Sequence, residues 1–182
     1  METTHGILIR KIRLTESSLI VTWFGKESGK IKTVIRSALK TNSKFSGKAD
    51  LFYEAEVFFT RSRKGDLCEL QDIVVHHRFE SCATDYTAMV MCSYFSELIE
   101  ITTDLFHPMP AVYDLLHRAL THLDKNAPSQ RALFHFEKEL CVQLGISDPR
   151  TAAGTHHVAL QEYSGKRSKL RNTLAGLLAQ KI

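Results

Sequence analysis

The sequence predicts an α+β protein: a small β-barrel over residues 1–78, followed by an all-helical domain over residues 79–182 with a basic C-terminal helix. Before residue 78, short β-branched and aromatic runs, some of them alternating, are separated by turn-rich stretches. After residue 79, apolar residues recur every three or four positions, the spacing of a helical stripe. Five short strands with no helix between them favour a closed barrel, because closure removes exposed strand edges.

Five segments are predicted to be strands because they are rich in β-branched or aromatic residues. They are HGILIRKIRL (5–14), SLIVTWF (18–24), KIKTVIR (30–36), FYEAEVFFT (52–60) and LCELQDIVV (67–75). The connection GKESGK resembles a phosphate-binding loop, but a P-loop has four residues between its glycines and a Ser or Thr after the lysine. Here only three residues separate Gly25 from Gly29, and Ile31 follows Lys30. A hairpin turn is the prediction at this position.

Four segments of the second half are predicted to be helical: 80–101, 110–123, 128–145 and 166–181. Pro110 stands where a helix tolerates proline, at its first position. Gly145 is placed to end the third helix, because glycine readily adopts the left-handed conformation that follows many helices.

Composition is that of an ordinary globular chain, with 43% hydrophobic and 24% charged residues. No apolar run is long enough to cross a membrane, and the N-terminal stretch lacks a signal-like apolar segment, so a cytoplasmic protein is expected. The four cysteines form no C-x-x-C pair and are predicted to be reduced core residues.

Positive charge is concentrated in two places. Residues 26–48 contain seven Lys and Arg and one acid, and residues 166–182 contain five Lys and Arg and no acid. An isolated charge run is often only a solvated loop, but this one connects two strands of a small barrel, where nucleic-acid-binding loops are commonly mounted. Phe45 is predicted to be exposed for base stacking. The predicted DNA contacts are Lys30, Lys32, Arg36, Lys40, Lys44, Phe45, Lys48, Lys166, Arg167, Lys169 and Arg171.

No catalytic or metal motif is recognisable. The sequence has no G-x-S-x-G, no H-E-x-x-H and no H-x-E followed by C-x-x-C. Two His-His pairs, at 76–77 and 156–157, are interpreted as solvated or capping histidines, since neighbours on a strand point to opposite faces. The prediction is a protein that is not an enzyme and has no cofactor.

An ordered series of fragments runs through the first half: GILIR (6–10), TESSLIVTWF (15–24), ESGKI (27–31), RSALKTNSKF (36–45), LF (51–52) and EVFF (56–59). In order and spacing, these fragments resemble the N-terminal domain of the bacterial RecO family of recombination mediators. The helical half is similar in kind, through YFSELIEITTD and FEKELCVQLGI.

This resemblance implies an OB-fold barrel followed by a helical domain. It also implies binding to single- and double-stranded DNA, annealing of complementary strands, and work with RecR to load RecA on gaps coated by single-stranded-DNA-binding protein (SSB). A bacterial, nucleoid-associated location follows from the same resemblance. The family docks the acidic, apolar-ended tail of SSB in its helical domain, and the candidate cations for such a site are Arg118, Arg131 and Lys138.

The sequence departs from the family pattern in two ways. The loop after the third strand usually reads Arg/Lys-Gly-Ala in the family, whereas here Ser37 precedes Ala38. Many relatives carry a four-cysteine zinc module after the Leu-Gly element, and the matching stretch here contains no cysteine. A zinc-free, shortened member is therefore expected.

Two other functions remain open at this point. The chain could be an adaptor whose basic surfaces bind acidic partner proteins, with incidental DNA contact. A metal-dependent enzyme that uses the histidines is the third and least favoured hypothesis.

Overall fold

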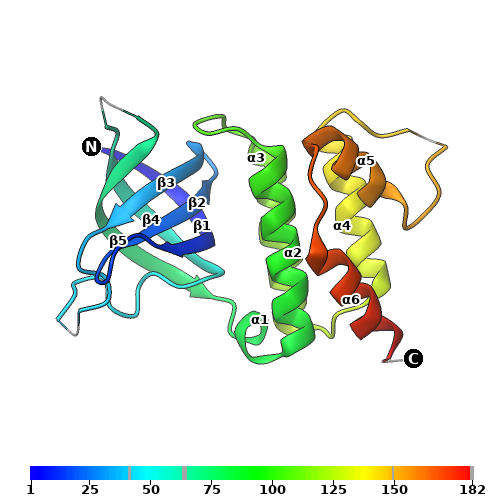
Figure 1. The fold of residues 1–182 in the computed structure, drawn as a ribbon, viewed down its shortest axis with the longest axis horizontal. Helices are drawn as coiled ribbons and strands as arrows, with labels where there is room; N and C mark the ends of the chain where they lie inside the picture. Colours follow the sequence, from blue (N-terminus) through cyan, green and yellow to red (C-terminus); the bar gives the residue numbers. More distant parts are fainter. Residues whose placement is uncertain (41, 63–64, 149, 181–182) are drawn as a thin grey trace. The chain divides into compact units, whose positions relative to one another are not determined.

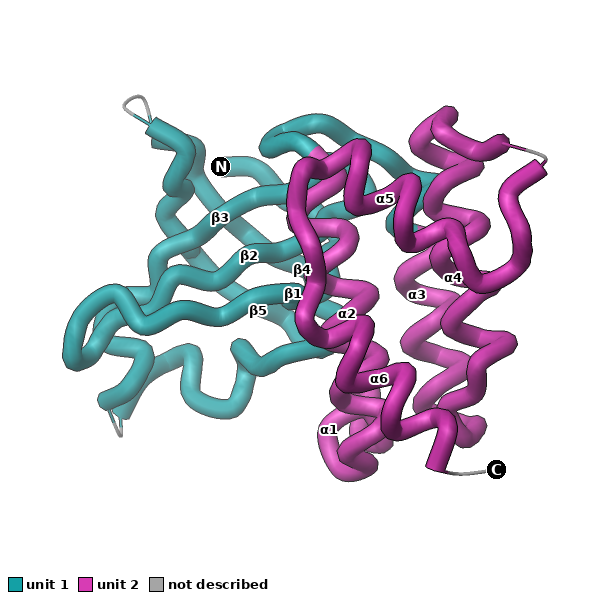
Figure 2. The backbone as a smooth tube through the Cα atoms, turned by 45° about the vertical axis from the view of Figure 1, so that its right-hand side comes forward, with its two compact units in different colours: residues 1–78, 104–113 teal, residues 79–103, 114–182 magenta. Residues whose placement is uncertain are grey.

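The structure is a computed structural model that describes residues 1–40, 42–62, 65–148 and 150–180. The chain divides into two compact units (Figure 2). Residues 1–78 and 104–113 form the barrel unit, and residues 79–103 and 114–182 form the helical unit. Residues 104–113, which interrupt the helical unit in the sequence, therefore belong to the barrel unit.

Five strands build the barrel unit: β1 (Glu2–Arg13), β2 (Leu19–Gly25), β3 (Gly29–Ile35), β4 (Tyr53–Thr60) and β5 (Leu67–Arg78) (Figure 1). They close in the order β1-β2-β3-β5-β4, with β4 paired back onto β1. All pairs are antiparallel except β3 with β5. This is the OB-type barrel that the sequence predicts.

The barrel interior is filled by alternating strand residues. Leu8, Val21, Trp23, Val57 and Ile73 are fully buried in one cluster. The one polar group of the tryptophan is satisfied inside, because Trp23 Nε1 donates a hydrogen bond to Thr33 Oγ1 at 3.1 Å. A large aromatic ring can stay in the core when its N–H has such a partner.

Phe45 belongs to the same core cluster, although it comes from the long β3–β4 connection. Its side chain is only 8% exposed. The prediction that Phe45 is an exposed stacking residue is therefore wrong. Its polar neighbours Ser43, Lys44, Ser46 and Gly47 concealed that the ring anchors the loop in the barrel.

The β2–β3 connection is the predicted hairpin turn. Gly29 has φ +69°, a conformation that favours glycine. A Cβ at this position would also lie 2.2 Å from the carbonyl oxygen of His107, in the segment that returns to the barrel unit. That segment is fixed by the Phe106 amide, which donates to the Lys30 carbonyl oxygen at 2.9 Å. Glycine is required here by both backbone conformation and space.

Ser37, where the family pattern has glycine, has φ 54°. A left-handed conformation destabilises the folded state by about 1–2 kcal/mol when the residue has a Cβ. Glycine removes this strain, but it also raises the conformational entropy of the unfolded chain, which offsets part of the gain in stability.

We expect Ser37→Gly to raise the free energy of unfolding by about 0.5–1 kcal/mol, measured from the urea midpoint. Ser46→Gly, in the same connection and without a positive φ, is the matched control and should be neutral or destabilising. Equal effects of the two variants would contradict the strain at Ser37.

The helical unit contains α1 (Ser81–Thr84), α2 (Tyr86–Thr102), α4 (Gln130–Gln143), α5 (His156–Ser164) and α6 (Lys169–Ala179), and α3 (Pro110–Lys125) runs from the barrel unit into it. In Figure 1, α2, α4 and α6 lie side by side. The ring of Phe95 on α2 stacks on that of Phe136 on α4, with centroids 3.9 Å apart.

Two helix ends lie where the residue types predict. Pro110 is the first residue of α3, and α4 ends just before Gly145, which has φ +70°. The predicted helix over 80–101 is divided, because the Asp85 carboxylate accepts a hydrogen bond from the Ala88 amide at 2.7 Å and starts α2 anew.

Helix α5 was not predicted. It is nine residues long and buries only His156 and Leu160, so its sequence carries too short an apolar pattern to be recognised.

A buried polar cluster joins α2, α4 and α6. Arg171 Nε lies 2.5 Å from Glu137 Oε1, and the Tyr94 hydroxyl donates to the same oxygen at 3.0 Å. Glu137 is fully buried. Burial and the nearby Glu137 charge raise the pKa of Tyr94, so its hydroxyl stays a donor at neutral pH. Ser168 at the start of α6 donates a further hydrogen bond to Glu97 on α2.

All four cysteines are free and buried, as predicted. Burial raises the pKa of the Cys141 thiol to about 11, and it raises the pKa values of Cys68 and Cys92 as well. The thiolate is the reactive form of cysteine, so all these effects slow its chemistry.

We expect the native protein to release much less than one equivalent of thionitrobenzoate from Ellman's reagent at pH 7.5, and all four equivalents after unfolding in guanidinium. Ser46→Cys adds an exposed thiol and should react at once. A rapidly reacting thiol in the unchanged protein would contradict the burial of the cysteines.

Candidate functional site

Two basic side chains lie on the outer face of the barrel. Arg10 on β1 and Lys32 on β3 are both register partners of Thr22 on β2. Thr22 faces outward, because its neighbours Val21 and Trp23 belong to the interior cluster and side chains alternate along a strand. Arg10 and Lys32 therefore flank the same position of the sheet.

The β3–β4 connection carries further cations, and most of it is fixed to the barrel. Phe45 anchors it in the core. Lys44 Nζ donates to the Gln71 carbonyl oxygen at 2.7 Å, and Lys48 Nζ lies 3.7 Å from Asp72 Oδ1. The Ile73 amide, together with Lys48 and Lys44, holds the pKa of Asp72 below its ordinary value. Lys44 and Lys48 are thus at the surface but already engaged with β5.

Arg36 and Lys40 are exposed in the same connection. Lys30 differs from them, because only 6% of it is exposed. It is the second residue of β3 and forms a β-bridge with Leu105. The prediction of Lys30 as a surface cation is wrong. We give the name barrel basic face to four cations: Arg10 and Lys32, which flank Thr22, and Arg36 and Lys40, which are exposed in the connection that follows β3.

Arg10 was missed by the sequence analysis. It is outside the dense basic segment, and alternation does not place it, because Leu8 faces the interior and Arg10 would follow on the same face. A register shift between Leu8 and Arg10 makes Arg10 the partner of outward-facing Thr22 instead. Arg10 and Lys32 lie on either side of Thr22 only because of the strand register, which the sequence did not provide.

The cations near the C-terminus differ in their exposure to solvent. Lys166, Arg167 and Lys169 are exposed around the start of α6. Arg171, one turn further along the chain, is 8% exposed and paired with Glu137. The prediction of Arg171 as a surface contact is therefore wrong, while Lys181 lies outside the described residues.

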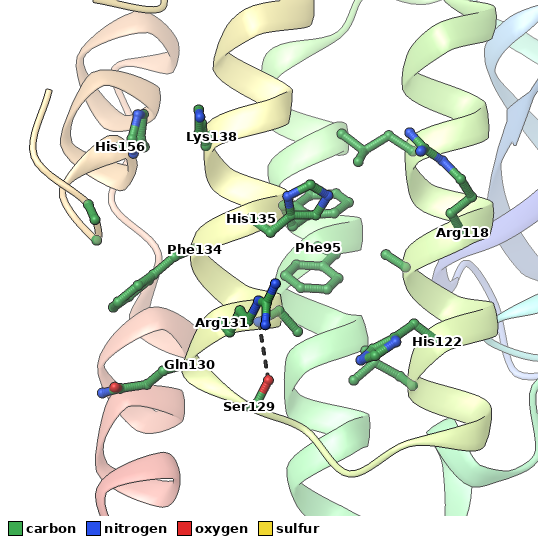
Figure 3. A pocket seen from close by; sticks show the side chains of 17 residues that line it. Phe95, Arg118, His122, Ser129, Gln130, Arg131, Phe134, His135, Lys138 and His156 are labelled. Carbon is green, nitrogen blue, oxygen red and sulfur yellow. Dashed lines mark hydrogen bonds between the residues drawn. The ribbon is translucent and has the colours of Figure 1, made fainter. Parts of the chain in front are cut away.

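A hollow of about 910 Å³ lies over α4 in the helical unit, between α3 and the chain that leads into α5 (Figure 3). Its floor includes the stacked rings of Phe95 and Phe136. The three cations proposed from sequence as partner contacts, Arg118, Arg131 and Lys138, all line it. None of the lining residues is an acid, so the hollow combines an apolar floor with positive charge.

Three histidines add to this lining: His122, His135 and His156. His122 and His135 are exposed, whereas His156 is only 6% exposed, so the interpretation of His156 as solvated or capping is wrong. The imidazole Nδ1 of His157 is 3.0 Å from the Gly154 carbonyl oxygen, close to the start of α5.

Within the described parts of the chain, no group of three or more His, Cys, Asp or Glu side chains is placed to hold a metal ion. In the same residues, no helix has the length and apolar character that a membrane span requires.

Comparison with known proteins decides the family. The model for the N-terminal region of recombination protein O matches residues 1–79, and the model for its C-terminal region matches residues 83–147. This chain belongs to the RecO family. Residues 148–182, which include α5 and α6, lie outside both matches.

Relatives of known name agree with this assignment. The DNA repair protein RecO of Listeria welshimeri is 31% identical over 146 residues, which cover 80% of this chain and 56% of that protein. The DNA repair protein RecO of Exiguobacterium sibiricum is 29% identical over 147 residues, covering 81% of this chain and 58% of the relative. The chain thus spans little more than half the length of these relatives.

Proposed function

We propose that this chain is a DNA repair and recombination protein. It binds single- and double-stranded DNA, anneals complementary strands and, with RecR, helps to load RecA onto gaps coated by SSB, in the bacterial cytoplasm at the nucleoid. The observation that carries the proposal is the barrel basic face, mounted on an OB-type barrel in a RecO family chain. The names of the relatives, DNA repair protein RecO, support the same role.

Annealing requires no covalent chemistry. Two strands repel each other through their phosphates, and cations that contact both backbones reduce this repulsion. Contacts that do not read base edges leave the strands able to search for register. A fixed arrangement of Lys and Arg on a barrel supplies such contacts, and no catalytic residue is part of the mechanism.

The DNA surface that we propose differs from the one expected from sequence. Lys32, Arg36 and Lys40 stay in it, and Arg10 joins them. Lys44 and Lys48 contribute at its edge, because their side chains already contact β5. Lys166, Arg167 and Lys169 form a second candidate surface on the helical unit. Lys30, Phe45 and Arg171 leave the set because they are buried.

The test is the fluorescence anisotropy of a labelled single-stranded oligonucleotide, titrated with protein at 50 and 200 mM salt. About four phosphate contacts, each with a slope near −0.7, give roughly a fifty-fold loss of affinity between the two concentrations. Sequence-independent binding with this salt dependence, accompanied by faster annealing of complementary strands, is the expected result. Negligible binding at 50 mM would overturn the proposal of a DNA surface.

A second candidate function is an adaptor for acidic proteins, and the hollow of the helical unit favours it. Its apolar floor and its cations Arg118, Arg131 and Lys138 suit a peptide that is acidic and ends in an apolar residue. The tail of SSB has this chemistry, so we propose that it docks there. The two candidate functions are compatible.

The adaptor alone would be favoured if the protein captured such a peptide but bound oligonucleotides only at very low salt. Charge reversal in the hollow, Arg118→Glu with Arg131→Glu, should abolish peptide binding and leave oligonucleotide affinity unchanged, because these cations belong neither to the barrel basic face nor to the second surface at Lys166, Arg167 and Lys169. Loss of both activities together would contradict separate sites.

A further inference from the structure

A row of aliphatic side chains crosses β1, β2 and β3, next to the row that Arg10 and Lys32 form. These three strands lie side by side in the barrel (Figure 1). Ile12 on β1 is the register partner of Ile20 on β2, and Ile20 is the partner of Val34 on β3. We call these three residues the aliphatic row. It lies two positions along each strand from the cations, a separation of roughly 7 Å.

The aliphatic row faces outward. Val21 and Ile35, its neighbours along β2 and β3, belong to the interior cluster, and side chains alternate along a strand. Ile12 is 42% exposed, and Ile20 and Val34 are half-buried. A sheet that covers a core with one face usually carries polar residues on the other. Three aliphatic residues in line on the outer face depart from that pattern and indicate a contact surface.

Apolar surface continues from this row to the cations of the β3–β4 connection. The Leu14 amide donates to the Ser18 carbonyl oxygen at 2.9 Å, and the Leu39 amide donates to the Ser17 carbonyl oxygen at 3.1 Å. The second bond joins the β1–β2 connection to the β3–β4 connection. Leu14 and Leu39 are both exposed, and Leu39 directly precedes Lys40. Apolar side chains and cations of the barrel basic face therefore lie together at this end of the barrel.

The aliphatic row itself does not attract phosphate. On β5, the register partner of Val34 is Glu69, an exposed acid, so the row leads to a negative charge. A carboxylate repels phosphate, whereas Arg10 and Lys32 attract it. A DNA strand with its phosphates on these two cations therefore has only its bases to place on the aliphatic side.

We propose that the aliphatic row holds the unpaired bases of a single DNA strand whose phosphates contact the barrel basic face. The inference rests on the proposed binding of DNA to that face. The flat faces of all four bases are largely apolar, so packing them on aliphatic side chains removes apolar surface from water without reading the sequence. In a duplex these faces are stacked on one another. The row therefore contacts a single strand and not a duplex.

This contact has a consequence for annealing. Bases must leave the aliphatic row before they can pair, so the annealed product keeps only its phosphate contacts with the barrel. The unpaired strand is thus held by one more kind of contact than the product. The difference favours release of the duplex and return of the protein to unpaired strands.

The test compares two labelled single strands of equal length, oligothymidine and the same backbone with abasic sites only, at 50 and 200 mM salt. Both carry the same number of phosphates, so counterion release contributes equally. We expect the unchanged protein to prefer oligothymidine about ten-fold. Ile12→Thr with Val34→Thr keeps a β-branched residue at both positions and should reduce this preference to about two-fold or less.

Three quantities should stay constant in this double variant. Its salt slope for oligothymidine should not change, because no cation is removed. Its affinities for the abasic strand and for a duplex should each change less than about two-fold, since neither presents unpaired bases. This combination separates the aliphatic row from the phosphate contacts.

The matched control is Val74→Thr with Val142→Thr. Val74 on β5 and Val142 on α4 are 45% and 46% exposed, close to Ile12, and lie outside the row. The control should keep the full preference. Leu39→Ser changes a connection instead of a strand and should reduce the preference about two- to three-fold. Trp23 fluorescence in urea shows whether the barrel of each variant is folded.

Each contrary result has one meaning. Equal affinity of the unchanged protein for the two strands overturns the inference and leaves the proposed DNA function intact. An unchanged preference in both the Ile12→Thr, Val34→Thr variant and Leu39→Ser overturns it as well. If the double variant had a lower oligomeric mass and an unchanged preference, the row would contact a second copy of the chain instead. Failure to bind either strand at 50 mM salt removes the proposed DNA surface together with the inference.

Discussion

Replacing Arg171 with methionine is expected to lower the free energy of unfolding of the helical unit by about 3–5 kcal/mol, because it leaves a buried charge without its partner. Glu137 has no exposed surface. After the change, only the Tyr94 hydroxyl would remain on Glu137 Oε1, and Glu137 Oε2 already has no hydrogen-bond partner among the described residues. A single neutral donor does not replace a guanidinium in an apolar interior.

Urea unfolding followed by circular dichroism at 222 nm measures this effect, because the helices dominate that signal. The chain has two compact units, so the barrel unit is followed separately by the fluorescence of Trp23, its only tryptophan. The Arg171→Met variant should move the helical transition to much lower urea concentration and leave the tryptophan transition much closer to its original position.

The control is the double variant Glu137→Met with Arg171→Met, which removes both charges and fills similar volume. Replacement of a buried ion pair by apolar residues is often neutral or stabilising, so the double variant should recover most of the lost stability. If the double variant were as unstable as Arg171→Met alone, packing rather than the unpaired charge would be the cause.

Arg171 also illustrates where sequence reasoning stops. Its neighbours Lys166, Arg167 and Lys169 are exposed, and the local pattern gave Arg171 the same role. What distinguishes it is Glu137, which lies 34 positions earlier in the chain and meets it only when α4 and α6 pack. Local periodicity carries no information on such a pairing.

The strands were more accessible to sequence analysis because their signal is local. Their β-branched and aromatic content, with alternation in some segments, predicted all five, and their number predicted closure. These local signals did not reveal Phe45, since its ring is inserted into the barrel from a connection that is polar on both sides.

The hollow of the helical unit could be predicted from sequence only in part. Arg118, Arg131 and Lys138 were proposed only as cations on helices, and tertiary packing placed all three around one apolar floor.

The basic stretch was predicted from charge density, whereas the surface that it forms depends on strand register. Lys32 belongs to the proposed DNA surface because β3 presents it outward beside Thr22, with Arg10 on the other side. Lys30, two positions earlier, is removed from the surface by the segment around Leu105. A count of lysines therefore overestimates the number of phosphate contacts available in residues 26–48.

Charge reversal of the two exposed loop cations, Arg36→Glu with Lys40→Glu, is expected to weaken single-stranded DNA binding roughly sixty-fold at 50 mM salt and roughly ten-fold at 200 mM. The estimate follows from counterion release. Each lost contact with a slope near −0.7 removes about an eight-fold gain at 50 mM and about a three-fold gain at 200 mM. The slope of the logarithm of affinity against the logarithm of salt should become shallower by about 1.4.

The matched control is Lys125→Glu with Arg150→Glu, which changes the net charge equally at two exposed cations of the helical unit. If long-range charge alone attracted DNA, both pairs would weaken binding to the same extent. Direct phosphate contact at Arg36 and Lys40 instead requires a much larger loss and a shallower slope for the loop pair only. Annealing of complementary strands should slow with the loop pair as well, since the same contacts reduce the repulsion between the two backbones.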